Sequence, residues 1–202
     1  ISRVLISNSK IQYNNIFKVE FVQVSMVELT NVTTQAFSKF DRTSDFDFIE
    51  CGKVIVTSSE FYNSFQSLNF IKTEFISLAQ CSFERVEQAL LIRKSERVDL
   101  KKINLSQVAL GFSIQETPFT HIAEVSVNSV ETLIQSFNFL TYTNEITLED
   151  TSISNMTVDS IISLSNCGFI LRNCYFKNLI CKNHACFAAQ SMSSVYHVYL
   201  HI

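Results

Sequence analysis

The sequence contains very little glycine, proline and tryptophan: three Gly, one Pro and no Trp in 202 residues. Folds that cradle phosphate in glycine-rich loops need more glycine than this, so Rossmann and P-loop chemistry is excluded. No apolar run approaches the roughly 18 residues of a membrane-spanning helix. The 16 Lys and Arg against 19 Asp and Glu leave no basic excess, which argues against nucleic acid as a partner.

Apolar residues are abundant instead. They make up 47% of the chain and include 18 Phe, whereas charged residues account for only 17%. This composition supports a packed core and excludes a disordered chain.

The apolar residues follow a repeated pattern. Each copy has two apolar residues two apart, then a small or apolar residue and a large apolar one, as in Val54-x-Val56-x-x-Ser59-x-Phe61. The second apolar residue of each copy serves as its register mark: Ile6, Val24, Val56, Leu78, Leu100, Ile122, Leu148 and Leu171. Successive marks lie 18, 32, 22, 22, 22, 26 and 23 residues apart.

Alternation with a period of two residues predicts strands, not helices. A second block of each copy, such as Ala89-Leu90-Leu91-Ile92, supplies further strand residues. One such unit cannot bury its apolar side chains alone, but stacked units bury them in a continuous column. The sequence therefore predicts an all-β fold, a right-handed parallel β-helix of about eight to nine coils and on the order of 40 Å long.

A leucine-rich-repeat solenoid is the alternative fold. Segments such as Leu100-x-x-Ile103-x-Leu105 also fit the opening of that repeat. Its next signature position requires a buried Asn or Cys, where this chain has residues such as Val86 and Val108. No capped helical stretch follows either, so we prefer the β-helix.

Asparagine and serine are expected to form the coil corners in place of glycine, because they tolerate a left-handed backbone. The repeat places the corner residues in two groups. Asn8, Asp150 and Asn173 form the first group, and Asn31, Asn63, Asn155 and Asn178 form the second.

Two segments carry a family resemblance. Cys81-Ser82-Phe83-Glu84-Arg85-Val86 is followed by Ala89-Leu90-Leu91, and Asn173-Cys174-Tyr175-Phe176-Lys177-Asn178 is followed by Ala185-Cys186. Both resemble the degenerate C-x-F-x-x-N and small-small-apolar repeats of pectin-lyase-like surface β-helices, as in chlamydial polymorphic outer-membrane proteins and large surface proteins of protists. The resemblance implies the β-helical fold and a surface location, whereas fold alone does not imply an activity.

An enzyme of this fold that acts on polysaccharides needs carboxylates clustered with Lys or Arg on one strand face. When the copies are aligned on the register marks, no such cluster lies at outward positions. The catalytic motifs of that fold are also absent from the sequence. We therefore expect no catalysis and no cofactor. A carbohydrate-active lyase or hydrolase is the alternative function.

The densest acidic stretch, from Asp41 to Glu50, lies in the interval of 32 residues. We interpret residues 41–50 as an inserted, solvated loop that projects from the coil. Asp41, Asp45 and Asp47 are weak candidates for a cation site, since carboxylate oxygens suit Ca²⁺. No glycine is present for the sharp turn of a calcium loop.

Six cysteines could form bridges or remain buried thiols. Cys81 and Cys174 share one template position several coils apart, too far for a disulfide, so we expect buried thiols there. Cys181 and Cys186 bracket a loop and are the best candidates for a disulfide. His197 and His201 would lie about 13 Å apart on a strand, which prevents them from binding one metal ion.

Three N-glycosylation sequons begin at Asn31, Asn104 and Asn155. Asn31 and Asn155 are expected at the same corner, facing water. Together with the resemblance, the sequons favour an extracellular or cell-surface location.

Residues 1–202 are therefore expected to form a single β-helix segment of a larger chain. We expect a non-catalytic structural or adhesion element that acts as a rigid rod or as an assembly or binding module. Neither terminal segment has a capping unit, so further coils of the same chain or other protein subunits are the expected partners, with glycans as further ligands. Nucleic acid is not expected to bind, and this part of the protein contains no membrane-spanning segment.

Overall fold

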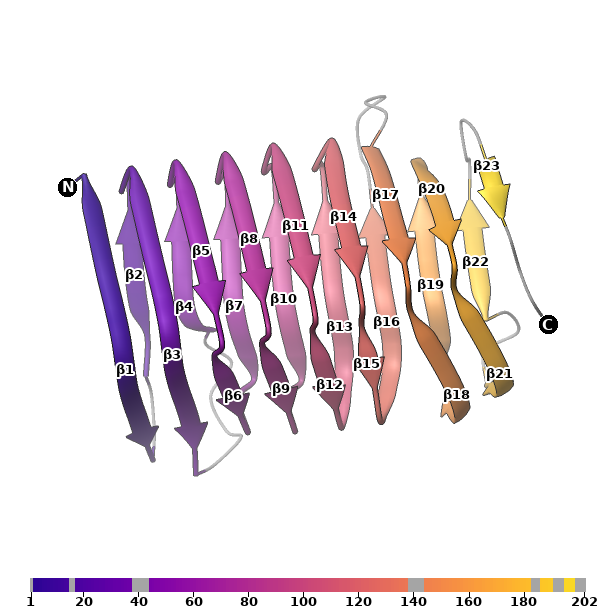
Figure 1. Cartoon of the computed structure of the whole chain (residues 1–202), viewed down its shortest axis with the longest axis horizontal. Helices are drawn as coiled ribbons and strands as arrows, with labels where there is room; N and C mark the ends of the chain where they lie inside the picture. Colours follow the sequence, from indigo (N-terminus) through magenta and orange to yellow (C-terminus); the bar gives the residue numbers. More distant parts are fainter. Residues whose placement is uncertain are drawn as a thin grey trace.

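The computed structural model describes residues 2–14, 17–37, 44–137, 144–182, 186–190 and 195–198. This part of the chain forms a parallel β-solenoid without a helix (Figure 1). In Figure 1 the nearer strands run downwards and the farther strands upwards while the chain advances from left to right, which is a right-handed path. The predicted β-helix is confirmed, and the leucine-rich-repeat alternative is wrong. Seven full turns separate Ile6 from Leu171, slightly fewer than expected.

The larger sheet of the solenoid is bent and forms two of its sides. Two long strands, β1 (Arg3–Tyr13) and β3 (Met26–Ala36), run along both sides. The first side, here called the first face, continues in β5 (Lys53–Thr57), β8 (Phe75–Ala79), β11 (Arg97–Lys101), β14 (Phe119–Ala123), β17 (Asn144–Glu149), β20 (Cys167–Arg172) and β23 (Val195–Val198). The second face continues in β6 (Glu60–Tyr62), β9 (Ser82–Glu84), β12 (Asn104–Ser106), β15 (Ser126–Val127), β18 (Ser152–Val158) and β21 (Tyr175–Cys181).

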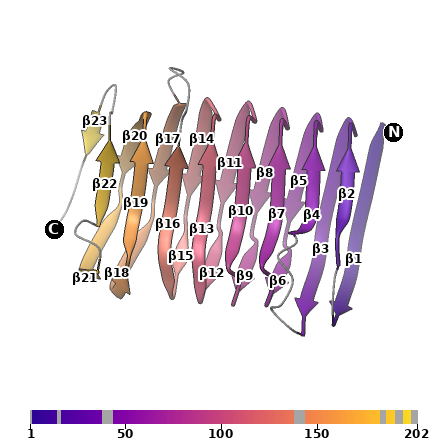
Figure 2. The same cartoon turned by 180° about the vertical axis from the view of Figure 1, so that it is seen from behind.

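A separate sheet of eight strands forms the third face, which is seen from its own side in Figure 2. Its strands are β2 (Val19–Val22), β4 (Ser44–Ile49), β7 (Gln66–Ile71), β10 (Gln88–Arg93), β13 (Val108–Gln115), β16 (Val130–Phe137), β19 (Ser160–Ser165) and β22 (Phe187–Gln190). Each strand pairs in parallel with its equivalents in the coils before and after it.

The inward side chains of the first face stack in one ladder. Its members are Ile6, Leu29, Val56, Leu78, Leu100, Ile122, Leu148 and Leu171. Seven of the eight predicted marks are confirmed, but the mark at Val24 is wrong because Leu29 occupies that position. Both residues fit the template, and the pairing of β3 with β1 and β5 decides between them. With Leu29 in place the spacings become 23, 27, 22, 22, 22, 26 and 23 residues.

The acidic stretch is not a projecting loop where the structure describes it. Residues 44–49 form β4, which pairs with β2 and β7. Phe46 and Phe48 are fully buried, and Asp45 and Asp47 are only 1% and 5% exposed. The prediction of a solvated loop is wrong for these residues because burying two phenylalanine rings stabilises the strand. Asp41 lies outside the described residues.

Aromatic side chains form ladders inside the solenoid. Phe48 and Phe70 stack with ring centroids 4.8 Å apart, and Phe61 and Phe83 stack at 5.0 Å. These spacings match the roughly 4.8 Å between paired strands, so equivalent rings in successive coils meet face to face. Stacking between coils therefore accounts for several of the phenylalanines in the sequence.

The corners of the coils depend on left-handed residues other than glycine. Within the described ranges, nineteen non-glycine residues have positive φ, whereas none of the three glycines does. They fall into three columns along the solenoid axis. The first column is Asn8, Asn31, Ser58, Gln80, Lys102, Glu124, Asp150 and Asn173; the second is Asn63, Arg85, Gln107, Asn155 and Asn178; the third is Gln23, Glu50, Lys72, Lys94, Glu116 and Asn166.

The next coil stabilises these corners. The backbone N–H of Gln80 donates to the carbonyl of Lys101 at 3.0 Å, and the N–H of Lys72 donates to the carbonyl of Arg93 at 2.9 Å. Such bonds offset the cost of a left-handed conformation, which is about 1–2 kcal/mol for a residue with a Cβ. Corner residues are therefore not restricted to Asn and Ser. Asn31 shares its column with Asn8, and the prediction that it shares a corner with Asn155 is wrong.

Candidate functional site

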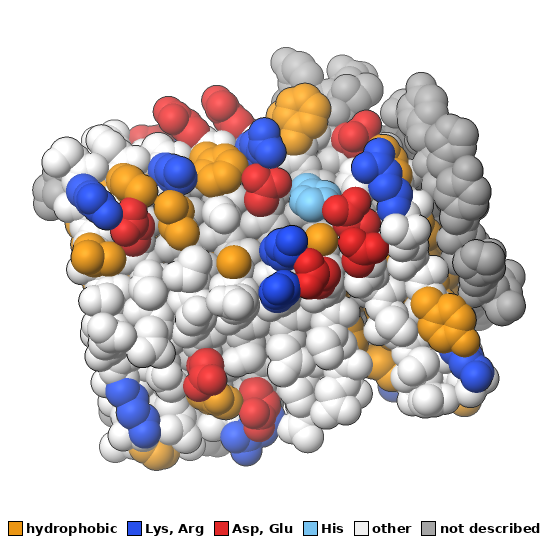
Figure 3. All heavy atoms as spheres, in the orientation of Figure 1, with side chains coloured by type: hydrophobic (Ala, Val, Ile, Leu, Met, Phe, Trp, Pro, Cys, Tyr) orange, Lys and Arg blue, Asp and Glu red, His pale blue; other side chains and the backbone are white. Residues whose placement is uncertain are grey.

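The outward side of the first face carries a group of charged side chains on successive strands. Asp99 of β11 and His121 of β14 are direct neighbours in the parallel ladder. Glu149 of β17 and Arg172 of β20 are neighbours one outward position further along their strands. Parallel pairing with an almost constant period therefore gathers residues that are far apart in sequence. In Figure 3 the pale blue histidine lies among acidic and basic side chains.

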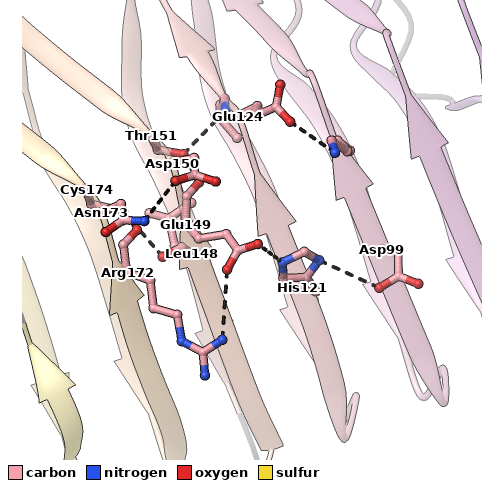
Figure 4. Close-up of polar contacts among 12 residues, drawn as sticks. Asp99, His121, Glu124, Leu148, Glu149, Asp150, Thr151, Arg172, Asn173 and Cys174 are labelled. Carbon is pink, nitrogen blue, oxygen red and sulfur yellow. Dashed lines mark hydrogen bonds and ion pairs between the residues drawn. The ribbon is translucent and has the colours of Figure 1, made fainter.

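His121 is the centre of this group (Figure 4). Its Nε2 lies 2.7 Å from Glu149 Oε1, and its Nδ1 lies 3.9 Å from Asp99 Oδ1. Arg97 Nε lies 3.3 Å from the other oxygen of Asp99, and Arg172 Nη1 lies 4.0 Å from the other oxygen of Glu149. The imidazole is thus held between two carboxylates, each of which also has an arginine. We call these five residues the His121 cluster.

A shallow pocket on the same face shares Arg97, Asp99 and His121 with the cluster. Its volume is about 340 Å³, and its outward lining residues are Arg97, Asp99, Phe119, His121, Glu145 and Thr147. Phe119 is 64% exposed, unlike the buried phenylalanines of the core. We call it the Phe119 pocket. It combines an apolar ring with carboxylates and a guanidinium, which are groups that bind polar ligands.

This site was not predicted from the sequence. The prediction that no carboxylates cluster with Lys or Arg at outward positions is wrong for the His121 cluster. The signal was present in the repeat, since Asp99 and His121 occupy the same position between Val98 and Leu100 and between Thr120 and Ile122. Glu149 was harder to find because its side chain reaches His121 from the next outward row.

The four free thiols lie inside the solenoid, away from this outward face. Cys51, Cys81, Cys167 and Cys174 are all buried, and each follows a left-handed corner residue. The Cys81 thiol donates to the carbonyls of Ala79 and Val56. The hydroxyls of Ser59 and Thr151 also donate to the carbonyl two residues earlier. A thiol and a hydroxyl can therefore each satisfy the backbone carbonyl that precedes a corner.

Burial also suppresses the reactivity of these thiols. It raises the pKa of the Cys81 thiol to about 11. Burial raises the pKa of Cys51, Cys167 and Cys174 as well. A thiol above its ordinary pKa is a poor nucleophile at neutral pH. These cysteines therefore pack as small apolar side chains that cap corner carbonyls.

Asp45 occupies an unusual buried position. It stands at the start of β4 and accepts hydrogen bonds from the hydroxyls of Tyr13 and Thr34, the latter at 2.9 Å. Burial raises the pKa of Asp45 to about 7, although hydrogen bonds from Tyr13, Thr34 and Ser64 favour the carboxylate. The carboxyl group is thus close to half-protonated at neutral pH.

Asp47 uses its oxygens differently. It accepts a hydrogen bond of 3.0 Å from Asn69 Nδ2, lies 2.9 Å from Lys18 Nζ and also accepts from the Ser44 hydroxyl. The carboxylate oxygens of Asp45 and Asp47, which were candidates to bind a cation, therefore accept hydrogen bonds from other groups of the protein. The part of the chain that the structure describes contains no group of three or more His, Cys, Asp or Glu that could hold a metal ion.

All three sequon asparagines are exposed. Asn31 donates from its side-chain amide to Asn8 Oδ1 at 2.8 Å, and Asn155 accepts from Asn178 at the same distance. Asn104 instead lines a polar groove of about 550 Å³ together with Ser58, Glu60 and Lys102. The groove runs beside the first column of corner residues, to which Ser58 and Lys102 belong.

The Sγ atoms of Cys181 and Cys186 are joined in a disulfide, with Cα atoms 5.4 Å apart. This is the pair predicted from the sequence as the best candidate for a disulfide. The backbone of His197 lies in β23, and His201 lies outside the described residues.

No helix within the described ranges is long and apolar enough to cross a membrane. Comparisons with protein-family models, with curated proteins and with solved structures give no match.

Proposed function

We propose that this chain is a non-catalytic β-solenoid segment of a larger surface or extracellular protein, where it acts as a rigid rod that presents the first face for binding. One observation carries this proposal: the left-handed corners are hydrogen-bonded from coil to coil. A solenoid bonded in this way at its corners has little freedom to hinge, and it suits a spacer or scaffold. The disulfide between Cys181 and Cys186 supports an oxidising, extracellular compartment.

The roles of the nucleophilic side chains also support a non-catalytic function. The described free thiols and several corner hydroxyls cap backbone carbonyls inside the solenoid. Bound and buried in this way, they are not available to a substrate on the outer surface.

A surface location is testable with antibodies raised against this chain. We expect them to label intact, unpermeabilised cells that express the full protein. Labelling that requires permeabilisation would contradict the surface location. Small-angle X-ray scattering of the purified protein would test the rod, because a hinged chain would give a broader distribution of distances than a rigid solenoid.

The His121 cluster favours one second candidate, a carbohydrate-active lyase or hydrolase. An imidazole 2.7 Å from a carboxylate is a chemically competent acid–base pair, and the Phe119 pocket lies beside it. Incubation with polygalacturonate and other polysaccharides, followed by measurement of new reducing ends and unsaturated products, tests this candidate. If the chain is a non-catalytic rod, we expect neither new reducing ends nor unsaturated products. Turnover that is lost in His121→Ala would establish the enzyme instead.

A further inference from the structure

The first outward row of the first face alternates cationic and aromatic side chains. Parallel pairing places Lys53 opposite Phe75, Phe75 opposite Arg97, and Arg97 opposite Phe119. Lys53 Nζ lies 5.3 Å from the centroid of the Phe75 ring, and Arg97 Cζ lies 5.9 Å from the same centroid. Phe75 therefore has a cation from each neighbouring strand, within the usual distance for a cation–π contact.

Phe119 has a different neighbour on its second side. Its partner on β17 is Glu145, so a carboxylate stands where the pattern around Phe75 has a cation. Phe119 is 64% exposed and Glu145 is exposed as well. Among the described residues Glu145 has no ion-pair partner, and residues 138–143 contain no Lys, Arg or His.

The other charges of the pocket are already matched. Arg97 pairs with Asp99 and lies over Phe75, while His121 lies between Asp99 and Glu149. Among the charged residues that line the pocket, Glu145 is thus the one whose charge, which is negative, has no ion-pair partner within the described residues. An exposed aromatic ring beside an unmatched carboxylate is suited to a cation, which gains the electrostatic attraction of both.

We propose that the Phe119 pocket binds the side chain of a lysine or arginine from a protein partner, with the cation placed beside Phe119 and Glu145. This inference rests on the proposed role of the first face as a binding surface. The chain itself provides the precedent, since it places both a lysine and an arginine beside the equivalent ring of Phe75.

The magnitude of these contacts favours a protein partner over a free amine. At an exposed site, a cation–π contact or an ion pair each raises affinity by only about two- to fivefold. An isolated ammonium or guanidinium would therefore bind very weakly. A basic side chain carried on a polypeptide can add backbone and side-chain contacts along the flat face of the sheet.

The test uses the whole chain, labelled with ¹⁵N, and follows the backbone amide signals of Phe119 and Glu145 during titration. The probes are acetyl-Gly-Ser-Arg-Ser-Gly-amide, its lysine version and a neutral twin with citrulline in place of arginine. Methylguanidinium and spermidine represent free small cations. We expect the arginine and lysine peptides to shift both signals, and the citrulline peptide to bind about tenfold more weakly.

The variants Glu145→Gln and Phe119→Leu should each weaken binding of the arginine peptide by about two- to fivefold. Glu87→Gln is the matched control, because it removes one exposed negative charge from another part of the solenoid. It should change binding by less than about twofold. Because positions 87, 119 and 145 are at the surface, the folded state should tolerate all three changes, and a thermal unfolding curve checks this for each variant.

Three results would overturn the proposal. No saturable shift below about 20 mM peptide would mean that there is no such site. Equal binding of the citrulline twin, or unchanged binding by Glu145→Gln and Phe119→Leu, would exclude recognition of the cation by this pocket. Equal or tighter binding of spermidine or methylguanidinium would identify a free cation as the ligand. None of these results bears on the rod itself, which the scattering and labelling experiments test separately.

Discussion

Asn178 donates a hydrogen bond of 2.8 Å from its side-chain amide to Oδ1 of Asn155, and both residues have positive φ at the same corner of adjacent coils. Asn8 and Asn31 repeat this relationship in the first column. Asparagine combines two properties there: it tolerates the left-handed backbone, and its amide bonds to an identical residue one coil away.

This relationship predicts different costs for two exposed asparagines. Asn155→Ala loses the bond from Asn178 and places alanine in a left-handed conformation, so the free energy of unfolding should fall by about 1–2 kcal/mol. Asn104 does not have positive φ, and it serves as the control. Asn104→Ala should cost less than about 0.5 kcal/mol in urea denaturation. Equal losses in the two variants would contradict a stabilising role of the asparagine column.

The backbone strain at a corner can be tested at Gln107, which is exposed and has φ of 55°. Gln107→Asn should raise the free energy of unfolding by about 0.5–1 kcal/mol, because asparagine is the better left-handed residue. Gln107→Val should lower it by about 1–2 kcal/mol, because a β-branched side chain is strongly disfavoured there. The two variants change one exposed position in opposite directions, so effects of the same sign would refute the argument.

The buried thiols should be inert in the folded protein. Burial raises the pKa of all four, with that of Cys81 at about 11, so little reactive thiolate forms at pH 8. We expect no reaction of native protein with Ellman's reagent and four equivalents after unfolding in guanidinium, with the Cys181–Cys186 bridge left intact. A thiol that titrates rapidly in native protein would show that its corner opens or that it is not buried.

Asp45 should make the stability of the protein depend on pH. Its folded-state pKa of about 7 lies above the value of 3.8 for an ordinary aspartate, so the folded state holds a proton that the unfolded state releases. The contribution of Asp45 to the free energy of unfolding should therefore be greatest at acidic pH. It should fall by about 1.4 kcal/mol per pH unit between about pH 4 and 7.

Asp45→Asn removes this dependence because an amide does not titrate. At pH 8 the variant should be more stable than the wild type, and their difference should shrink as the pH is lowered towards 5. Urea denaturation at several pH values measures this. Asp159→Asn, at a side chain that is 37% exposed, is the control and should keep the slope of the wild type. A wild-type slope that persists in Asp45→Asn would assign the pH dependence to another group.

The sequence by itself determined the fold class of this protein. Apolar residues two apart, repeated at nearly constant intervals, are compatible with stacked strands and with little else, and seven of the eight marks lie in the inward ladder. The left-handed corners at Asn8, Asp150 and Asn173 could also be predicted, because the conformational preference of asparagine and aspartate is local.

Only the tertiary structure decided the register of the second coil and everything that depends on it. Val22-x-Val24 and Val27-x-Leu29 are neighbouring apolar pairs that both fit the repeat, so local alternation does not show which pair stacks on Val4 and Ile6. Pairing of β3 with β1 and β5 selects Leu29, and the same choice makes residues 44–49 a buried strand and moves Asn31 to the corner of Asn8. The contact between the side chains of His121 and Glu149 likewise depends on the stacking of neighbouring coils, because the two residues lie 28 positions apart and in different outward rows.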